Sequence, residues 1–293
     1  MPVARGAGPD AVVVGSGPNG LAAAIVLAEA GQSVLVREAQ PTLGGGARSA
    51  ELTLPGFVHD VCSAVHPLAL GSPLFRRLPL TRFGLEWIQP PYALAHPFDD
   101  GTAAILERSL AATARRLGAD GPAYVTLLSP FVDEWQALAS GILGPLRPPR
   151  HPIIMARFGL LGIRSARGLA EAAFQTERAR ALFAGLAAHS FLPLEEPPSA
   201  AFALVLAILA HVVGWPIPRG GAQEISGALA GYLRALGGTL ETCAEVRSLD
   251  DLPPHHTTLL DVTPRQVLRI AGDRLPPLYR WQLGRYRYGP GVF

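Results

Sequence analysis

The chain has 293 residues, of which 49% are hydrophobic and 16% are charged, and its formal net charge is +2. This composition excludes a disordered chain, and the absence of a dense basic run interleaved with aromatic residues argues against a nucleic-acid partner. All 25 basic residues are arginine, so chemistry that needs a lysine Schiff base is excluded.

The two cysteines and the N-terminal residues constrain the expected cellular location. Cys62 and Cys243 stand far apart and not in a C-x-x-C motif, which excludes a dithiol redox pair and argues against a disulfide-stapled secreted protein. We expect both to be buried as small apolar residues. Residues 1–9 lack the apolar stretch of a signal peptide, so the expected location is the cytoplasm.

The first 40 residues carry the pattern of a βαβ unit. Residues 10–14 are a β-branched run, which is typical of a strand buried on both faces, and they lead into a G-x-G-x-x-G turn at residues 15–20. A helix is expected over residues 21–30, ended by Gly31, and a second strand over residues 33–37 delivers Glu38 to its carboxyl end. Strand, turn, helix, strand and acid in this order predict a site for an adenine dinucleotide.

Each part of the pattern has a mechanical reason. Glycines in the turn allow a tight bend, close approach of a diphosphate and close packing of the helix, whose N-terminus offers free N–H groups. Glu38, 18 residues beyond Gly20, can accept hydrogen bonds from ribose hydroxyls and disfavours a 2′-phosphate, which favours FAD or NAD over NADP. The alternative is a glycine-rich turn without a ligand. The candidate cofactor-binding residues here are Gly15, Ser16, Gly17, Pro18, Asn19, Gly20, Glu38 and Ala39.

A second glycine cluster follows the acid, and a plain NAD-dependent dehydrogenase has no need of it. It comprises Gly44, Gly45 and Gly46, followed by Arg48, Ser49 and the phrase Pro55-Gly56-Phe57 with Asp60. On these residues the sequence resembles the flavoprotein superfamily of phytoene desaturases, carotenoid isomerases and flavin amine oxidases. The Pro55-Gly56-Phe57 phrase is similar to the phytoene-dehydrogenase-like branch in particular.

The resemblance implies FAD as the cofactor. In the family a Gly-Gly pair passes close to the FAD diphosphate and ribityl chain, and Gly44 and Gly45 match that pair, while Ser49 stands where the family often has Thr or Ser. Amine oxidases carry Arg directly after the pair, whereas here Gly46 follows and the arginine is displaced to Arg48. This departure favours the desaturase-like branch.

The middle of the chain is expected to be mainly helical. Residues 61–87 are interpreted as loop with short helical pieces. His59 and His66 flank Cys62, but these three side chains supply only three ligands and do not predict a metal site. Strands are expected at 84–90 and 93–98 with a turn at 99–101, and helices at 102–117 and 123–143, with two or three more over 153–187.

Residues 200–213 form the most apolar run in the chain. The run has 14 residues and a membrane span needs about 20, so we interpret it as a helix in the core or along a substrate tunnel. Shallow insertion into a membrane is the alternative. His211 near its end is expected to be a core histidine with its hydrogen bonds satisfied.

The phrase Pro218-Arg219-Gly220-Gly221 opens a second informative series. A helix follows, Gly237-Gly238 ends it, and a strand is expected over residues 239–249. This series again resembles the phytoene-dehydrogenase-like proteins, and the resemblance implies that Val246 contacts the adenine. An ordinary return from helix to strand is the alternative. Beyond it we expect a strand at 258–262, a helix opened by Thr263 and Pro264, and the start of a strand at 286–293.

These patterns predict an α/β protein with a Rossmann-like FAD/NAD(P)-binding domain of the GR2 type and a mostly helical α+β substrate domain. The first part of the FAD domain is expected at 1–83, the substrate domain at 84–217, the return to the FAD domain at 218–262, and a truncated substrate segment at 263–293. Because the family's chains are longer, the resemblance implies an N-terminal fragment with an incomplete flavin-ring pocket.

The predicted function is an FAD-dependent oxidoreductase that transfers a hydride from an apolar, polyene or lipid-like substrate to the flavin. No catalytic side chain stands out, and peripheral contact with a membrane is a second option for its location. The alternatives are an NAD-dependent dehydrogenase and a truncated, inactive dinucleotide-binding protein. The substrate, the electron acceptor and the oligomeric state are not predicted.

Overall fold

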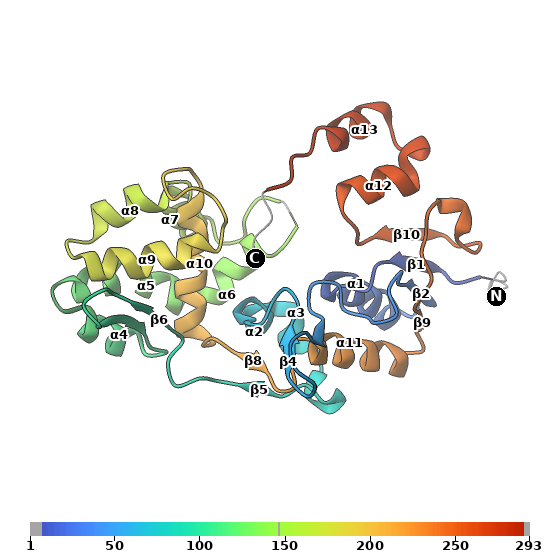
Figure 1. Cartoon of the computed structure of the whole chain (residues 1–293). Helices are drawn as coiled ribbons and strands as arrows, with labels where there is room; N and C mark the ends of the chain where they lie inside the picture. The colour runs from blue at the N-terminus through green and yellow to red at the C-terminus, as the bar shows by residue number, and fades with distance from the viewer. Residues whose placement is uncertain (1–7, 146, 290–293) are drawn as a thin grey trace. The chain divides into compact units, whose positions relative to one another are not determined.

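The computed structural model describes residues 8–145 and 147–289. The chain divides into two compact units, which we call the sheet unit (Met1–Ala64, Pro79–Trp87, Pro218–Phe293) and the helical unit (Val65–Leu78, Ile88–Ile217). Three segments fall differently from the predicted boundaries: residues 65–78 belong to the helical unit, and residues 84–87 and 263–289 belong to the sheet unit. Figure 1 labels the elements of both units.

A four-stranded parallel sheet forms the centre of the sheet unit. Its order is β10-β1-β2-β9, and the pairs are parallel throughout, with Ala11 opposite both Val34 and Thr257 (Figure 1). The fold is therefore α/β and Rossmann-like, as the sequence predicts. The strands are β1 (Ala11–Val14), β2 (Val34–Arg37), β9 (Thr239–Glu241) and β10 (Thr257–Leu260).

Apolar packing explains why these short segments are strands. All four residues of β1 are buried, which matches its uninterrupted run of small and β-branched side chains. Helix α1 (Pro18–Glu29) packs against α11 (Gln223–Ala235), and Leu21 and Ile25 of α1 are fully buried. Helix α1 begins three residues earlier than predicted, because proline is well suited to the first helical position.

Smaller elements complete the sheet unit. An antiparallel hairpin that the sequence analysis does not predict joins β3 and β4, and β5 and β8 form a separate two-stranded ladder. The bounds within the sheet unit are β3 (Ser49–Glu51), β4 (Val58–Asp60), η1 (Leu80–Phe83), η3 (Leu249–Asp251), α12 (Pro264–Ala271), η4 (Gly272–Arg274) and α13 (Pro277–Gly284). Strands β5 (Trp87–Ile88) and β8 (Ile217–Pro218) lie where the chain passes from one unit to the other.

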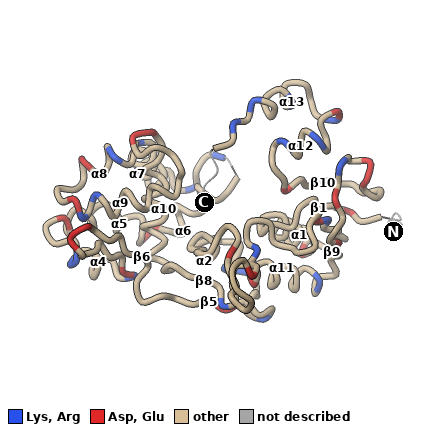
Figure 2. The backbone as a smooth tube through the Cα atoms, in the orientation of Figure 1, with Lys and Arg blue, Asp and Glu red and all other residues tan. Residues whose placement is uncertain are grey.

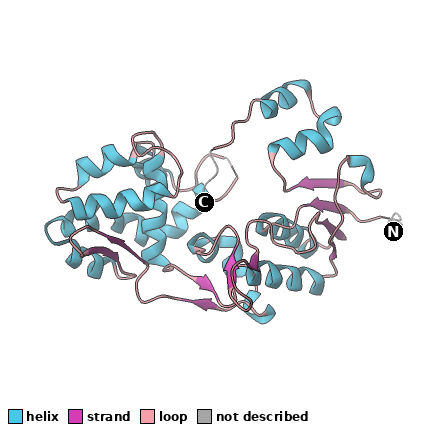
Figure 3. Ribbon diagram, viewed as in Figure 1, coloured by secondary structure: helices cyan, strands magenta, loops and turns pink. Residues whose placement is uncertain are grey.

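The helical unit consists of helices with one antiparallel hairpin (Figure 3). Its elements are α2 (Pro67–Gly71), α3 (Pro73–Arg77), β6 (Leu94–Pro97), β7 (Ala103–Leu106), α4 (Leu110–Leu117), η2 (Gly118–Asp120), α5 (Gly121–Asp133), α6 (Trp135–Ile142), α7 (Pro152–Gly162), α8 (Ala166–Ala173), α9 (Glu177–Ala188) and α10 (Ser199–Val212).

Helix α10 is the core of the helical unit. It carries no Asp, Glu, Lys or Arg (Figure 2), and it contacts α9, α7, α5, α8 and α2. Leu204 and Ile208 are fully buried. The interpretation as a core helix is confirmed, and insertion of this run into a membrane is wrong because neighbouring helices cover it. None of the helices over 8–145 and 147–289 is long and apolar enough to span a bilayer.

His211 near the end of α10 is a satisfied core histidine, as predicted. Its Nε2 lies 2.9 Å from the Tyr124 hydroxyl and its Nδ1 lies 3.1 Å from the Arg108 carbonyl oxygen. The carbonyl can only accept, so Nδ1 carries the proton and Nε2 accepts from Tyr124. Burial lowers the pKa of His211 below its ordinary value.

Four predicted elements differ from the structure. Residues 102–117 are not one helix, because Ala103–Leu106 pairs with β6 across the predicted turn and buries Ala104 and Leu106. The helix predicted at 123–143 is interrupted at Glu134, whose backbone leaves the helical region at φ −105° and ψ 24°. Strand β9 ends at Glu241, because Cys243 adopts a left-handed φ of +53° that a strand cannot continue through.

The fourth difference is the last predicted strand. Residues 286–289 are irregular, and residues 290–293 lie outside the described part of the chain. The expected burial of the cysteines is also wrong: Cys62 and Cys243 are both exposed, because each lies in an irregular segment just beyond a strand of the sheet unit.

Candidate functional site

A cavity of about 670 Å³ opens at the carboxyl ends of β1, β2 and β10. This edge of a parallel sheet is where ligands bind in open α/β folds, particularly where the chain connections diverge to either side of a strand. The lining belongs entirely to the sheet unit and comprises Val14 to Asn19, Arg37 to Gln40, Gly45, Gly46, Ala244 to Val246, Asp261 to Thr263, Gln266, Arg269 and Ile270.

The first glycine turn forms the floor of the cavity and requires its glycines. Gly15 has a φ of +101°, and a Cβ there would lie 2.3 Å from the carbonyl oxygen of Asp261. A Cβ on Gly20 would lie 2.5 Å from the carbonyl oxygen of Gly15. Both predicted mechanical roles, the tight turn and the close helix packing, therefore have specific steric causes.

The N-terminus of α1 presents unpaired donors to the cavity. Pro18 at the first helical position has no N–H, and over the described ranges 8–145 and 147–289 the N–H groups of Gly17 and Asn19 have no hydrogen-bond partner. Free N–H groups at a helix N-terminus attract anions, because the helix dipole places partial positive charge at the same end. The turn is therefore suited to a phosphate.

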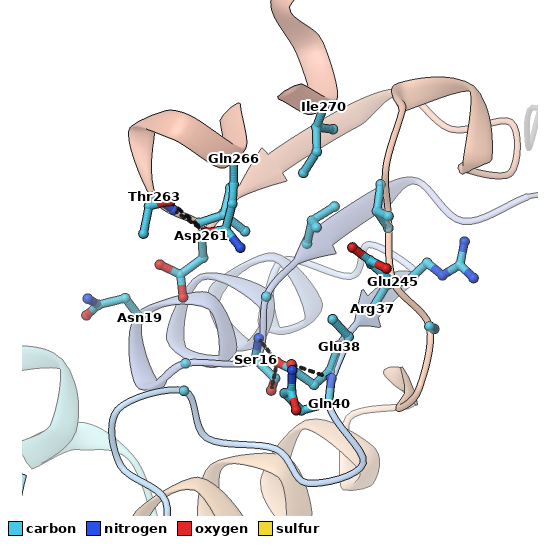
Figure 4. Close-up of a pocket in the computed structure, with 18 of the residues that line it drawn as sticks. Ser16, Asn19, Arg37, Glu38, Gln40, Glu245, Asp261, Thr263, Gln266 and Ile270 are labelled. Atoms are coloured by element: carbon cyan, nitrogen blue, oxygen red, sulfur yellow. Dashed lines mark hydrogen bonds between the residues drawn. The ribbon is translucent and has the colours of Figure 1, made fainter. Parts of the chain in front are cut away.

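Glu38 is fastened to the same turn. Its Oε2 accepts hydrogen bonds from Ser16 N at 3.0 Å and Ser16 Oγ at 2.5 Å, and its Oε1 accepts from Gln40 N at 2.9 Å (Figure 4). The side chain is 9% exposed and, with Ala39, lines the cavity. The carboxylate thus positions the glycine turn as well as facing the place predicted for a ribose.

The second glycine cluster packs on the first. Gly44 N donates to Ser16 O at 3.1 Å, and a Cβ on Gly45 would lie 3.1 Å from Gly17 Cα. Gly45 and Gly46 line the cavity, whereas Gly44 lies behind the lining with a φ of +122°. The two glycine motifs, separated in the sequence, form one surface.

Three further predicted residues also lie outside the lining. Gly20 faces Asp261 at the edge of α1. Arg48 Nε donates to Gly45 O at 2.8 Å and so holds the second cluster. Ser49 Oγ donates to Asp60 Oδ1 at 2.7 Å and accepts from Gln223 N at 3.0 Å, which fastens the β3–β4 hairpin to the start of α11.

Val246 lines the cavity and is only 4% exposed. It packs with Val14 and Ile270 in a small apolar cluster. The segment before it is tied to the end of β2, since Ala244 N donates to Glu38 O at 2.8 Å. An apolar wall beside backbone groups is suited to the face of an adenine ring.

The most consequential residue that the sequence analysis missed is Asp261. It follows β10 directly (Figure 4), and its Oδ2 accepts from Gly20 N at 2.7 Å, which takes one of the free donors of α1. A signal was present: a polar residue directly after a buried strand and before a helix lies at the ligand-binding edge of a parallel sheet.

Two other features of the lining were also missed. Thr263 and Gln266 form a capping box at the start of α12. Arg37, Glu245 and Arg269 add charge, so that two arginines and three carboxylates lie around the cavity. None of the lining residues is Cys, His, Lys or Tyr. The arrangement can bind and orient a ligand, and two of its three carboxylates, Glu38 and Asp261, already accept hydrogen bonds from backbone N–H groups of the site.

Comparison with known proteins agrees with this geometry. Residues 13–78 match the family model described as NAD(P)-binding Rossmann-like domain. A segment of 102 residues is 36% identical to the mouse (Mus musculus) protein named pyridine nucleotide-disulfide oxidoreductase domain-containing protein 2, and covers 34% of this chain and 17% of that protein.

Solved structures resemble the chain over nearly its whole length. An oxidoreductase from Methanosarcina mazei has a TM-score of 0.62 at 17% identity, covering 94% of this chain and 65% of that one. A mutant putrescine oxidase has a TM-score of 0.59 at 21% identity, and the match covers 94% of this chain and 62% of that one. A fatty acid isomerase from P. acnes has a TM-score of 0.56 at 15% identity, and the match covers 89% of this chain and 60% of that one. The chain spans just under two thirds of each structure, and at these identities the likeness shows the fold alone.

Proposed function

We propose that the chain is the dinucleotide-binding part of an FAD-dependent oxidoreductase. The observation that carries the proposal is the joint surface of the two glycine motifs, with the unpaired N–H groups of Gly17 and Asn19 at its centre. The proposal is supported by the match of residues 13–78 to a dinucleotide-binding family model and by a curated relative whose name is that of an oxidoreductase.

The residues present fit an adenine dinucleotide. The N–H groups of Gly17 and Asn19 would hold the diphosphate, Glu38 would accept from the ribose hydroxyls with its remaining lone pairs, and Val246 would contact the adenine. Gly45 and Gly46 extend the surface beyond the first turn, which favours FAD over NAD as the longer-reaching ligand. Bound FAD supplies the two-electron acceptor, and the protein orients it and excludes water.

The finer proposal concerns the branch and the substrate. The sequence pattern Pro55-Gly56-Phe57 and the displaced Arg48 support a phytoene-dehydrogenase-like protein, in which a hydride leaves a C–H bond of an apolar, polyene or lipid-like substrate. Two of the three carboxylates of the lining, Glu38 and Asp261, are occupied by hydrogen bonds from backbone N–H groups, which is consistent with chemistry carried by a cofactor. A protein named as a fatty acid isomerase has a similar fold, and a substrate of that kind is consistent with the class proposed here.

A titration of the purified chain with FAD tests the proposal. We expect saturable one-to-one binding, competition by ADP, and much weaker competition by NADP because of Glu38. Gly17→Val should abolish binding, since its side chain would fill the place of the diphosphate beside Asp261. The matched control is Gly227→Val in α11, where a Cβ meets nothing within 4 Å.

The outcomes separate the rival functions. Tight NAD binding without FAD binding would favour the NAD-dependent dehydrogenase. Stoichiometric FAD that no apolar substrate can bleach would favour the inactive binding protein. If neither FAD nor ADP binds, or if Gly17→Val binds as well as the unchanged chain, the proposal is wrong.

A further inference from the structure

Helix α7 is apolar on two opposite sides, and only one of them is covered. Ile154 and Phe158 are buried at 2% and 8% exposure, as expected for the face that packs on α10 and α6. Ile153 and Leu160 are 77% and 74% exposed, and Ile163 just beyond the helix is 69% exposed. An exposed apolar helix face of this kind marks an interaction surface.

The exposed side chains form a continuous stripe. Ile153, Ala156, Leu160 and Ile163 follow one another at intervals of three, four and three residues, which places them within about a quarter of the helix circumference.

The charge around the stripe has one sign. Residues 135–170 contain five arginines and no aspartate or glutamate. Arg147, Arg150 and Arg157 are exposed, and among the residues that the structure describes none of the three has an acidic partner. The exception lies at the far edge, where Arg167 pairs with Glu171 and Glu195. We call Ile153, Ala156, Leu160 and Ile163, with Arg147, Arg150 and Arg157, the α7 face.

We propose that the α7 face docks on the surface of an anionic lipid bilayer, with α7 lying in the plane of the interface. Apolar side chains on one side of a helix flanked by arginines are suited to the boundary between headgroups and acyl chains. The arginine stems can lie along the apolar layer while the guanidinium groups reach the phosphates. The proposed contact is peripheral, with α7 along the bilayer surface.

The unbalanced charge favours this occupant over a second copy of the chain. Two α7 faces brought together would place the unpaired arginines of both copies side by side, and like charges at close range oppose association. An anionic surface removes that repulsion and gains about fivefold in binding for each arginine near it. The proposal does not depend on dinucleotide binding, because the α7 face belongs to the helical unit.

Co-sedimentation of the whole chain with lipid vesicles tests the proposal. We expect the chain to pellet with vesicles of phosphatidylcholine mixed with phosphatidylglycerol, less at high salt, and little with phosphatidylcholine alone. The double variant Ile153→Ser/Leu160→Ser should bind anionic vesicles at least about tenfold more weakly than the parent chain. The double variant Arg147→Gln/Arg150→Gln should also bind them roughly tenfold more weakly, or weaker still. All four side chains are exposed, so the variants should keep the thermal unfolding of the parent chain.

A matched control uses exposed apolar residues elsewhere. Leu278 and Trp281 of α13 are 67% and 56% exposed, and Leu278→Ser/Trp281→Ser should leave vesicle binding unchanged. Failure of the parent chain to pellet with anionic vesicles overturns the proposal, as does equal binding to neutral vesicles or loss of binding only in the α13 variant. A dimer that Ile153→Ser/Leu160→Ser dissolves, seen by light scattering, would assign the face to a second copy instead.

Discussion

Asp261 places a negative charge beside the very donors that a diphosphate would use, and this leads to a prediction opposite to the usual result of mutating a site residue. Its carboxylate accepts from Gly20 N at 2.7 Å, one residue along α1 from the unpaired N–H of Asn19. Asparagine keeps an oxygen that can accept the same hydrogen bond but carries no charge. We therefore expect Asp261→Asn to bind FAD or ADP more tightly than the parent chain.

The magnitude follows from Coulomb's law. Taking about 6 Å between the carboxylate and the nearer phosphate, and an effective dielectric of about 40, the repulsion is about 1.4 kcal/mol per unit charge, or roughly tenfold in affinity. Because salt screens partly exposed charges, the gain should shrink as ionic strength rises. Calorimetric titration with ADP at low and high salt measures both effects.

The alanine variant separates charge from positioning. Asp261→Ala removes the charge and also the acceptor for Gly20 N–H, so it should unfold about 1–3 kcal/mol more easily and lose the gain in affinity. If Asp261→Asn binds ADP more weakly than the parent chain at low salt while its stability is unchanged, the diphosphate does not lie at the N-terminus of α1 and the reasoning is wrong.

Three other perturbations follow from the site and the core. Glu38→Gln must turn an amide N–H₂ toward either Ser16 or Gln40, and both of these residues donate hydrogen bonds to the carboxylate in the parent chain. The free energy of unfolding, measured with denaturant, should therefore fall by about 1–3 kcal/mol, and the affinity for ADP should fall as well. An unchanged free energy of unfolding and an unchanged ADP affinity would contradict these hydrogen bonds. Gly45→Val places a β-branched side chain 3.1 Å or less from Gly17 Cα, at a backbone φ of +54° that valine rarely adopts, so FAD binding should be lost. Gly56→Val, in the exposed loop of the β3–β4 hairpin, should retain FAD binding. Burial lowers the pKa of His211, so the unfolded chain binds a proton that the folded chain does not, and stability should fall as pH drops below about 6.5. His211→Gln should flatten that dependence in unfolding measured from pH 7.5 to 5, and an unaltered slope would show that His211 does not contribute.

The sequence predicts the central βαβ unit well because its signals are local. The run of β1, the glycine turn and Glu38 lie within 30 residues, and each is required by backbone geometry that only a few residue types allow. The same holds for the start of α12, where Thr263 and Pro264 open the helix as predicted. Val246 was found only through a family resemblance, since nothing in its own neighbourhood distinguishes it from an ordinary core valine.

What the sequence could not provide depends on distant partners. Ala103–Leu106 has helix-forming composition and becomes a strand because β6 pairs with it. Asp261 is identified as a site residue only in the folded chain, where its carboxylate contacts Gly20, which lies 241 residues away in the sequence. The exposure of Ile153 and Leu160 likewise cannot be read from an apolar helix, because periodicity does not reveal which side another helix covers.

The order of the strands has a consequence for synthesis of the chain. Strands β1 and β2 are complete by Arg37, but their outer neighbours β10 and β9 begin at Thr257 and Thr239. At about 5–20 residues per second, the ribosome leaves both edges of the first two strands uncovered for roughly 10 to 40 seconds while most of the helical unit is made. Nascent chains should therefore recruit a chaperone to residues 11–37 until translation passes residue 260, and stalling before that point should expose strand edges that aggregate.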